Sequence, residues 1–307
     1  MKNLLVLPLL ASALCASPFV VINDFETDIS GILPVYAPGE DTSNTVIFRV
    51  ENGGPTFDDG FIPGNIPGAG GSASYLELDM LAFDSSDNFV GVIQGPRVQW
   101  NVPTGVLPFI SGQGHRVSIY LDDANNGDSE GSYYPAGSAI FWQPGMMGAS
   151  TTARVAAGGF GIRTIDVDPT ANVDLRWFAT ADGDAIGYND ASAAIQSTEL
   201  SKGWYTFETR WVDDLNGMVD EINRIFDDSG NLVATYIRSS IIPVSFVGGL
   251  GNVSVGGGTD EIGGPVSLLT LIGIDRPTLI VPEASTTILV LLGAIPLLTR
   301  RRQSLHL

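Results

Sequence analysis

The sequence predicts an all-β protein whose strands pair antiparallel and pack as a β-sandwich. In the middle of the chain, apolar and polar residues alternate in short runs, and Gly, Pro, Asn and Asp separate these runs. A period of two is typical of strands with one buried face, and no long stretch keeps the period of a helix. The 37 Gly and 18 Pro supply the turns that many short strands need. One continuous β-rich region predicts a single large sandwich.

The predicted strands are short, alternate in polarity and end at turn-forming residues. In chain order they cover residues 45–51, 74–84, 89–93, 98–102, 115–122, 139–143, 164–167, 174–179, 204–211, 218–227, 232–239 and 268–275. Asn216-Gly217 and the polar segment 227–231 are the clearest turn signals, so we expect the three strands that they connect to form an antiparallel meander. By alternation, Trp204 and Trp211 are expected in the core.

The N-terminus has the layout of a secretory signal peptide, in which a lysine precedes an apolar run and small residues follow. Cleavage is expected after Ala16 or Ala13, which predicts a signal peptide over residues 1–16 and an exported domain over residues 17–279. Lipidation of Cys15 is the alternative, although the residue before it is not small. Cleavage after Ala16 removes this only cysteine, so core packing must hold the domain without a disulfide.

The C-terminal segment, residues 280–307, combines a short motif, an apolar run and a basic end. In order it contains Pro282, Glu283, Ala284, an uncharged run over residues 285–299, and then Arg300, Arg301 and Arg302. An apolar helix favours hydrocarbon, and the arginines hold their end on the cytoplasmic side. The run is shorter than the roughly 20 residues that span a bilayer, so it predicts a transient inner-membrane anchor. The alternative is a buried C-terminal core helix.

This order of elements resembles the PEP-CTERM sorting signal of Gram-negative bacteria. Pro282, Glu283, the apolar run and the arginine triplet match the signal, whereas Ala284 stands where its usual third residue is proline. The resemblance implies export, processing near Pro282 by an exosortase-type membrane enzyme, and delivery to the cell surface or to an extracellular polysaccharide matrix. It implies no chemistry for the exported domain.

The exported domain also resembles concanavalin-type jelly rolls. The similarity lies in the meander of residues 204–238, the later segments 247–251 and 271–275, and the opening segment 22–26, which is similar to the first strand of many carbohydrate-binding jelly rolls. The resemblance implies a jelly-roll sandwich. Carbohydrate binding follows from it by analogy only.

The chain is strongly acidic, with a formal charge of −19 at pH 7. Without Lys2, Glu283 and the arginine triplet of the two signals, 11 basic and 33 acidic residues remain, which gives −22. Such a charge repels nucleic acid and anionic lipid, so neither is expected as a partner. It favours solubility or the binding of divalent cations.

Catalytic patterns in the sequence are incomplete. Glu77 and Asp79 share one face of a predicted strand, as the carboxylates of laminarinase-type glycoside hydrolases do, but residues 80–83 lack the further glutamate of that pattern. His115 is the only histidine before the tail, and no Gly-x-Ser-x-Gly elbow or zinc ligand set accompanies it. The glycines at 68–71 and 256–258 lack a nearby lysine and are expected in loops rather than around phosphate. The sequence therefore predicts that the protein is not an enzyme.

Calcium is the only cofactor that the sequence suggests. Asp122, Asp123, Asn125 and Asp128 place hard oxygen donors around Gly127. The segment departs from an EF-hand loop, because Gly127 stands at a ligand position and no glutamate occupies the twelfth. The alternative is a polar turn that binds no ion.

Trp100 and Trp142 are the candidates for sugar stacking, since flat rings pack against the faces of sugars. The alternative places them in the core. Taken together, the sequence predicts an exported, non-catalytic structural or adhesive β-sandwich at the cell surface or in the matrix. The alternative function is a carbohydrate-binding module or a divergent glycoside hydrolase that acts on extracellular polysaccharide.

Overall fold

A computed structural model describes the chain in twelve segments. These are residues 19–28, 32–35, 45–51, 68–82, 97–100, 109–121, 138–149, 154–157, 160–166, 175–180, 198–259 and 268–282. The predicted signal peptide, the predicted strand 89–93, the predicted calcium segment 122–130 and the part of the sorting segment after Pro282 lie outside the described residues.

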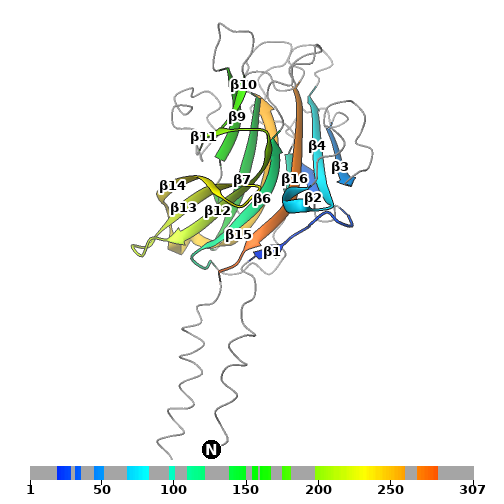
Figure 1. Ribbon diagram of the computed structural model, residues 1–307. Helices are drawn as coiled ribbons and strands as arrows, with labels where there is room; N and C mark the ends of the chain where they lie inside the picture. Colours follow the sequence, from blue (N-terminus) through cyan, green and yellow to red (C-terminus); the bar gives the residue numbers. More distant parts are fainter. Residues whose placement is uncertain are drawn as a thin grey trace, which may run out of the picture.

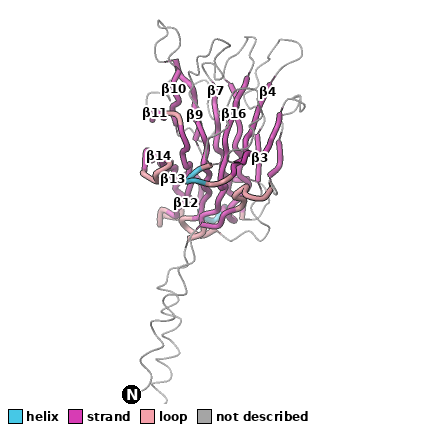
Figure 2. The backbone as a smooth tube through the Cα atoms, turned by 45° about the vertical axis from the view of Figure 1, so that its right-hand side comes forward, coloured by secondary structure: helices cyan, strands magenta, loops and turns pink. Residues whose placement is uncertain are grey.

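Two antiparallel sheets pack against each other, which confirms the predicted all-β sandwich (Figures 1 and 2). The first sheet contains, in spatial order, β14 (Leu232–Pro243), β13 (Met218–Asp227), β12 (Gly203–Asp213), β6 (Gln113–Leu121), β16 (Leu268–Ile280), β4 (Ser74–Ala82) and β3 (Thr45–Glu51), with β1 (Phe19–Val21) paired to the end of β16. The second contains β11 (Thr198–Leu200), β10 (Leu175–Thr180), β9 (Phe160–Asp166), β7 (Ser138–Gly148), β15 (Val247–Thr259), β5 (Arg97–Trp100) and β2 (Ile32–Val35), with β8 (Arg154–Ala157) paired to β7. Two 3-10 turns, η2 (Ala69–Gly71) and η4 (Val244–Phe246), complete the described elements.

Most predicted strands are present, and the predicted meander is formed by β12, β13 and β14. β3 and β13 have the predicted bounds. Leu215 and Gly217 adopt positive φ angles of 63° and 86° in the first turn, the backbone region that a tight reversal needs. Gly230 does the same in the second turn, with φ of 81°.

The expectation that glycines 256–258 lie in a loop is wrong. They belong to β15, where they pair with residues 139–141 of β7. The neighbouring strand supplies the hydrogen bonds, so a run of glycines can remain extended despite its low β propensity. Within the same strand, a Cβ atom at Gly251 would come within 3.1 Å of the Gly145 backbone, which shows that the two strands approach closely there.

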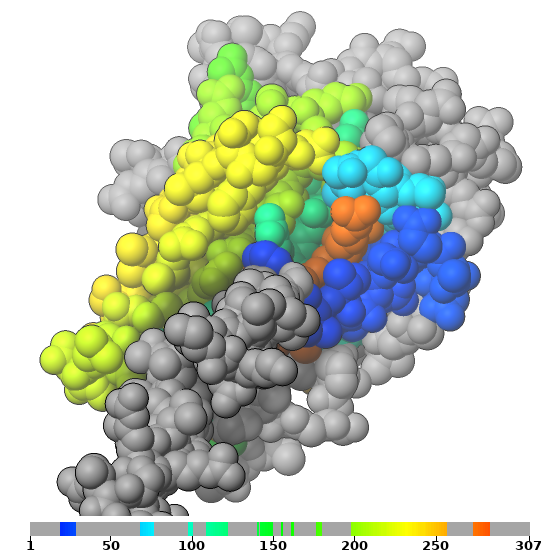
Figure 3. Space-filling model, turned by 60° about the horizontal axis from the view of Figure 1, so that its bottom comes forward, coloured from blue at the N-terminus to red at the C-terminus, as the bar shows by residue number. Residues whose placement is uncertain are grey.

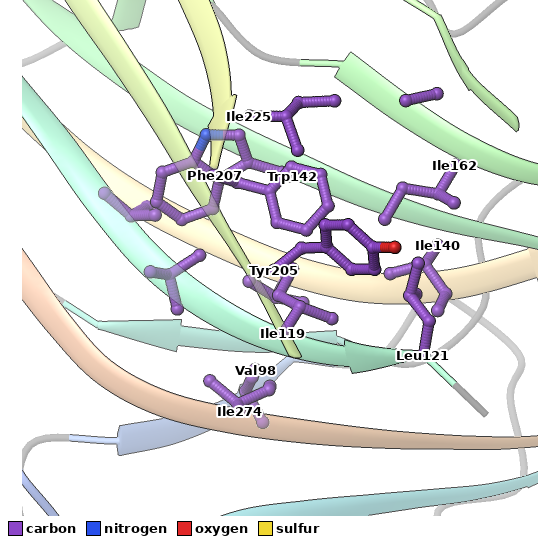
Figure 4. Close-up of a cluster of buried hydrophobic side chains, with 14 of the residues drawn as sticks. Val98, Ile119, Leu121, Ile140, Trp142, Ile162, Tyr205, Phe207, Ile225 and Ile274 are labelled. Carbon is purple, nitrogen blue, oxygen red and sulfur yellow. The ribbon is translucent and has the colours of Figure 1, made fainter. Parts of the chain in front are cut away.

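The main core lies between the sheets, where the inward-facing side chains of β6, β12 and β16 meet those of β5, β7, β9 and β15 (Figure 4). Its buried members are Phe25, Leu76, Val98, Trp100, Val117, Ile119, Leu121, Ile140, Trp142, Ile162, Trp177, Ala179, Leu200, Tyr205, Phe207, Ile225, Val253, Val255 and Ile274. A second cluster around Trp211 and Met146 continues the core beyond Thr209. Burial of this apolar surface is the main force that holds the sheets together.

A polar chain crosses the sandwich between these two apolar clusters. Trp142 Nε1 donates to Thr209 Oγ1 at 3.0 Å, and Thr209 Oγ1 donates to Asn223 Oδ1 at 2.6 Å. Asn223 Nδ2 donates to Glu221 Oε1 at 2.7 Å, and the Glu221 carboxylate also pairs with Arg238 at 3.3 Å. Thr209, Asn223 and Glu221 are fully buried, so each hydrogen bond in the chain satisfies a group that water cannot reach.

Thr209→Val should test this polar chain. The change keeps the shape of the side chain but leaves Trp142 Nε1 and Asn223 Oδ1 without their partner, so we expect the free energy of unfolding to fall by about 2–4 kcal/mol. Thr206→Val is the matched control, because the Thr206 hydroxyl bonds Ser118 on the outer face of the same strand. Urea denaturation followed by fluorescence measures both. Equal losses in the two variants would contradict a special role for the buried chain.

Candidate functional site

The outer face of the first sheet carries a group of arginine side chains around one glutamate. Because Tyr205 and Phe207 point into the core, the alternate residues of β12 point outward. The strand pairing sets Glu208 beside Arg116 of β6 and beside Arg224 of β13. Figure 3 shows part of this surface, with β14 in yellow, β16 in orange and residues 19–28 in dark blue.

Three arginines surround one carboxylate on this face. Arg210 Nε lies 2.7 Å from Glu208 Oε1, and Arg224 Nη1 lies 3.6 Å from the same oxygen. The Glu208 side chain is only 2% exposed although it points away from the core. We call Arg116, Arg210, Arg224 and Glu208 the arginine cluster. Its formal charge of +2 contrasts with the charge of −19 for the whole chain.

Arg116 is held between two aromatic rings. Its guanidinium lies 5.2 Å from the centre of the Phe19 ring and 5.3 Å from that of Phe226, distances at which a cation is attracted to the face of a ring. Burial lowers the pKa of Arg116, and the charge of Arg210 lowers it further, whereas Glu208 opposes the shift. An arginine keeps its charge through any such change at neutral pH. The cation is therefore fixed in place and partly stripped of water.

The arginine cluster has more donors than its own carboxylate can accept. Each guanidinium carries five N–H donors, whereas one carboxylate offers about four acceptor sites. A second anion with oxygen acceptors, such as a carboxylate or a sulfate, matches both the charge and the donor geometry of arginine. The face can therefore bind an anionic group from solution.

Next to the arginine cluster, residues 68–73 cross the outer face, and we call this segment the strap. It includes η2 and covers the rings of Tyr75, Tyr120 and Trp204, whose neighbouring ring centres are 5.4 Å apart. Trp204 is thus buried as expected, but beneath the strap and not between the sheets.

Carboxylates from three distant parts of the chain hold the strap. Ala69 N–H donates to Asp275 Oδ2 at 3.0 Å, Gly70 N–H to Asp228 Oδ1 at 3.0 Å, and Ala73 N–H to Glu26 Oε1 at 3.0 Å. Asp275 is fully buried. Burial raises the pKa of Asp275 to about 7, against the opposing effect of the neighbouring Arg276 charge.

The structure does not place the two tryptophans predicted to stack on sugar where a sugar could reach them. Trp100 and Trp142 are each about 1% exposed and lie in the main core, with ring centres 6.1 Å apart. Alternation places a strand residue on one of two faces but cannot say which face is covered by a second sheet.

The other predicted site residues fall in three groups. Glu77 and Asp79 lie in β4, where they pair with Gly273 and Leu271. The calcium candidates Asp122, Asp123, Asn125 and Asp128 lie outside the described residues, as do the sorting residues Glu283, Ala284 and Arg300 to Arg302. Pro282 follows β16 by two residues.

Neither a metal site nor a membrane span is found in the described part of the chain. No three His, Cys, Asp or Glu side chains there are grouped to hold a metal ion. None of the helical segments there is long and apolar enough to cross a membrane.

Comparison with known proteins identifies similar folds only among solved structures. No protein-family model and no curated protein matches the chain. A carbohydrate-binding module, the CBM2 module of the evolved Dit protein of Lactobacillus casei BL23 phage J-1, is 11% identical, with 85% of this chain and 94% of that chain covered and a TM-score of 0.39. The endo-β-1,4-glucuronan lyase of the fungus Trichoderma reesei is 11% identical over 83% of this chain and 96% of its own, with a TM-score of 0.41. The PL-14 alginate lyase of Aplysia kurodai is 9% identical over 69% and 84%, with a TM-score of 0.40.

The prediction that the protein is not an enzyme is contradicted by these similarities, because two of the three structures are polysaccharide lyases. The absence of a hydrolase pattern bears on hydrolysis only and does not exclude bond cleavage by a lyase. At 9–11% identity the likeness concerns the fold and assigns no reaction to this chain.

Glu208→Gln should test the electrostatic balance of the arginine cluster. The change removes the only negative charge of the cluster and leaves its three guanidiniums to repel one another, so we expect the free energy of unfolding to fall by about 1–2 kcal/mol. Glu199→Gln is the control, since the Glu199–Arg176 pair is exposed and its loss should cost less than about 0.5 kcal/mol. Urea denaturation at low and high salt measures both. A Glu208 variant that is as stable as the control would contradict the expected role of Glu208.

Proposed function

We propose that this protein is an exported cell-surface or extracellular-matrix protein whose β-sandwich, of the concanavalin-like jelly-roll type, binds acidic polysaccharide through the arginine cluster. The observation that carries this proposal is the excess of three guanidiniums over one carboxylate on an outer sheet face, in a chain that is otherwise acidic. Uronic acid polymers carry regularly spaced carboxylates, which are the natural partners of arginine.

The aromatic neighbours of the cluster support a sugar ligand over a free anion. Phe19 and Phe226 flank Arg116, and a partly exposed ring next to a fixed cation can contact the apolar face of a pyranose while the arginine binds its carboxylate. Phe19 comes from β1, which begins three residues after the expected signal-peptide cleavage at Ala16. Phe19 would therefore remain in the exported form.

The proposed destination fits this ligand. The PEP-CTERM-like segment predicts delivery to a polysaccharide-rich surface layer after processing by an exosortase-type enzyme. A negatively charged domain is repelled by acidic polymer except at a local positive site, which gives a weak but position-specific adhesive contact.

Arg224→Gln should reduce binding to a polyuronate such as alginate. Removal of one guanidinium is expected to lower affinity about threefold to tenfold and to weaken its salt dependence. Arg176→Gln is the matched control, because Arg176 also forms one surface ion pair but lies on β10 of the second sheet. Calorimetric titration of the purified exported protein measures both variants, with a neutral glucan as the control polymer.

Two outcomes would contradict the proposed function: equal binding to alginate and to the neutral glucan, or equal losses in the two arginine variants. The same mixtures should be followed for a decrease in polymer length, since the similar folds include lyases. Chain cleavage that Arg224→Gln slows and Arg176→Gln does not would place a reaction on the same face.

Replacement of Pro282 and Glu283 by alanine should test the proposed sorting. We expect the exported protein to stay in the inner membrane with residues 283–307 attached, whereas the unaltered protein reaches the surface or medium with a shorter C-terminus. Cell fractionation and intact mass measurement report both. Recovery of the unaltered full-length chain from the cytosol would contradict export.

A further inference from the structure

We propose that Asp275 makes ligand binding by the arginine cluster depend on pH, with the neutral side chain permitting binding and the ionised side chain opposing it. This inference rests on the proposed function, because it concerns the control of that site. It requires that Asp275 lie close to the cluster, that its environment disfavour charge, and that its ionisation affect a movable part of the face.

The strand register places Asp275 next to the cluster. Asp275 of β16 pairs with Ser118 of β6, and Thr278, on the other side of a bulge, pairs with Arg116. Ser118 and Arg116 are two residues apart on one strand, so they point to the same face about 7 Å from each other. The Ser118 hydroxyl lies 3.0 Å from the Thr206 hydroxyl, which continues the same row across β12. A charge on Asp275 would therefore lie on the same face as Arg116, beside Ser118, the next outward-facing residue of β6.

The carboxyl of Asp275 is enclosed by the strap. Its Oδ2 accepts one hydrogen bond from Ala69 N–H, while its Oδ1 is buried without a hydrogen-bond partner among the described residues. A Cβ atom at Gly68 would lie 3.0 Å from Oδ2, so the strap backbone packs directly on the carboxyl. The Ser72 side chain and the backbone of Ala69 and Arg276 favour the ionised form by hydrogen bonding, but burial of the carboxyl outweighs them.

The charged groups around Asp275 do not compensate its charge from within the enclosure. Arg276 is the next residue on β16 and is exposed, with its guanidinium toward Gly70 of the strap. Glu26 and Asp228 hold the other parts of the strap and are themselves acidic. His115 of β6 faces the interior of the sandwich, on the opposite side of the sheet. Burial therefore favours a neutral Asp275, and the opposing charge of Arg276 is too weak to overcome it.

The sign of the pH effect follows from these contacts. Burial raises the pKa of Asp275 from 3.8 to about 7, so the closed strap is favoured most below about pH 4, and this advantage falls as the pH rises until it levels off above about 7. If the carboxyl becomes fully hydrated when the strap opens, the two pKa values predict a roughly tenfold increase in the opening equilibrium between pH 6 and pH 8.5. Above pH 7 the face therefore gains a negative charge and a looser strap.

Asp275→Asn is the decisive variant. Asparagine can still accept from Ala69 N–H but cannot ionise. The affinity of the unaltered protein for alginate should fall roughly threefold to tenfold between pH 6 and pH 8.5, whereas the variant should keep its affinity. The ligand stays ionised throughout, because unperturbed carboxyl groups titrate near pH 4. Asp228→Asn is the matched control, since it weakens the strap but retains Asp275, and should keep the pH dependence.

Hydrogen exchange without ligand separates this inference from the proposed function. The amide of Ala69 should lose protection about tenfold between pH 6 and pH 8.5 in the unaltered protein relative to Asp275→Asn at the same pH. If alginate does not bind at any pH but this loss occurs, the proposed function fails and the strap behaves as inferred. If alginate binds with the same pH dependence in both proteins, or the Ala69 amide exchanges alike in both, the role of Asp275 is overturned.

Discussion

The alternation of side chains along β6, β12 and β13 is the constraint on which the rest of the structure depends. Successive residues of a strand point to opposite faces, so a shift of one residue would carry Arg116, Glu208 and Arg224 into the core and expose Val117, Phe207 and Ile225. Burial of the apolar set therefore fixes the outer set without any attraction between its members. Burial of the apolar residues determines the strand register, and this register places the residues of the arginine cluster side by side.

Much of this fold can be read from the sequence, because period-two alternation and turn residues are local signals. The meander of β12 to β14 is the clearest case. The glycine-rich end of β15 is not predictable in this way, since its extended form depends on β7 and not on its own side chains. The arginine cluster is hidden for a related reason: Arg116 and Glu208 are far apart in sequence, and only the pairing of β6 with β12 makes them neighbours. Burial of Trp100 and Trp142 likewise depends on which face the second sheet covers.

The sandwich has two networks of polar side chains, one buried between the sheets and one on the outer face of the first sheet. Inside, Glu221 and Asn223 belong to a closed chain of hydrogen bonds that satisfies its own members. Outside, the arginine cluster has donors in excess and is bordered by rings. Charge screening over about 8 Å in physiological salt confines the influence of each system to its surroundings, so the acidic remainder of the chain does not neutralise the cluster. A local positive site can thus exist on an acidic protein.

The pairing of β1 with the end of β16 has a mechanical consequence. Phe19 lies opposite Ile280, so the chain enters and leaves the described domain at the same end of the sandwich (Figure 1). A load between an attachment after Pro282 and a polymer held on the first sheet would run along β16, a strand with neighbours on both sides. Ladder hydrogen bonds lie across the strands, so such a pull stretches many of them together instead of peeling them one at a time. The position of β16 between its neighbours would resist traction in that direction.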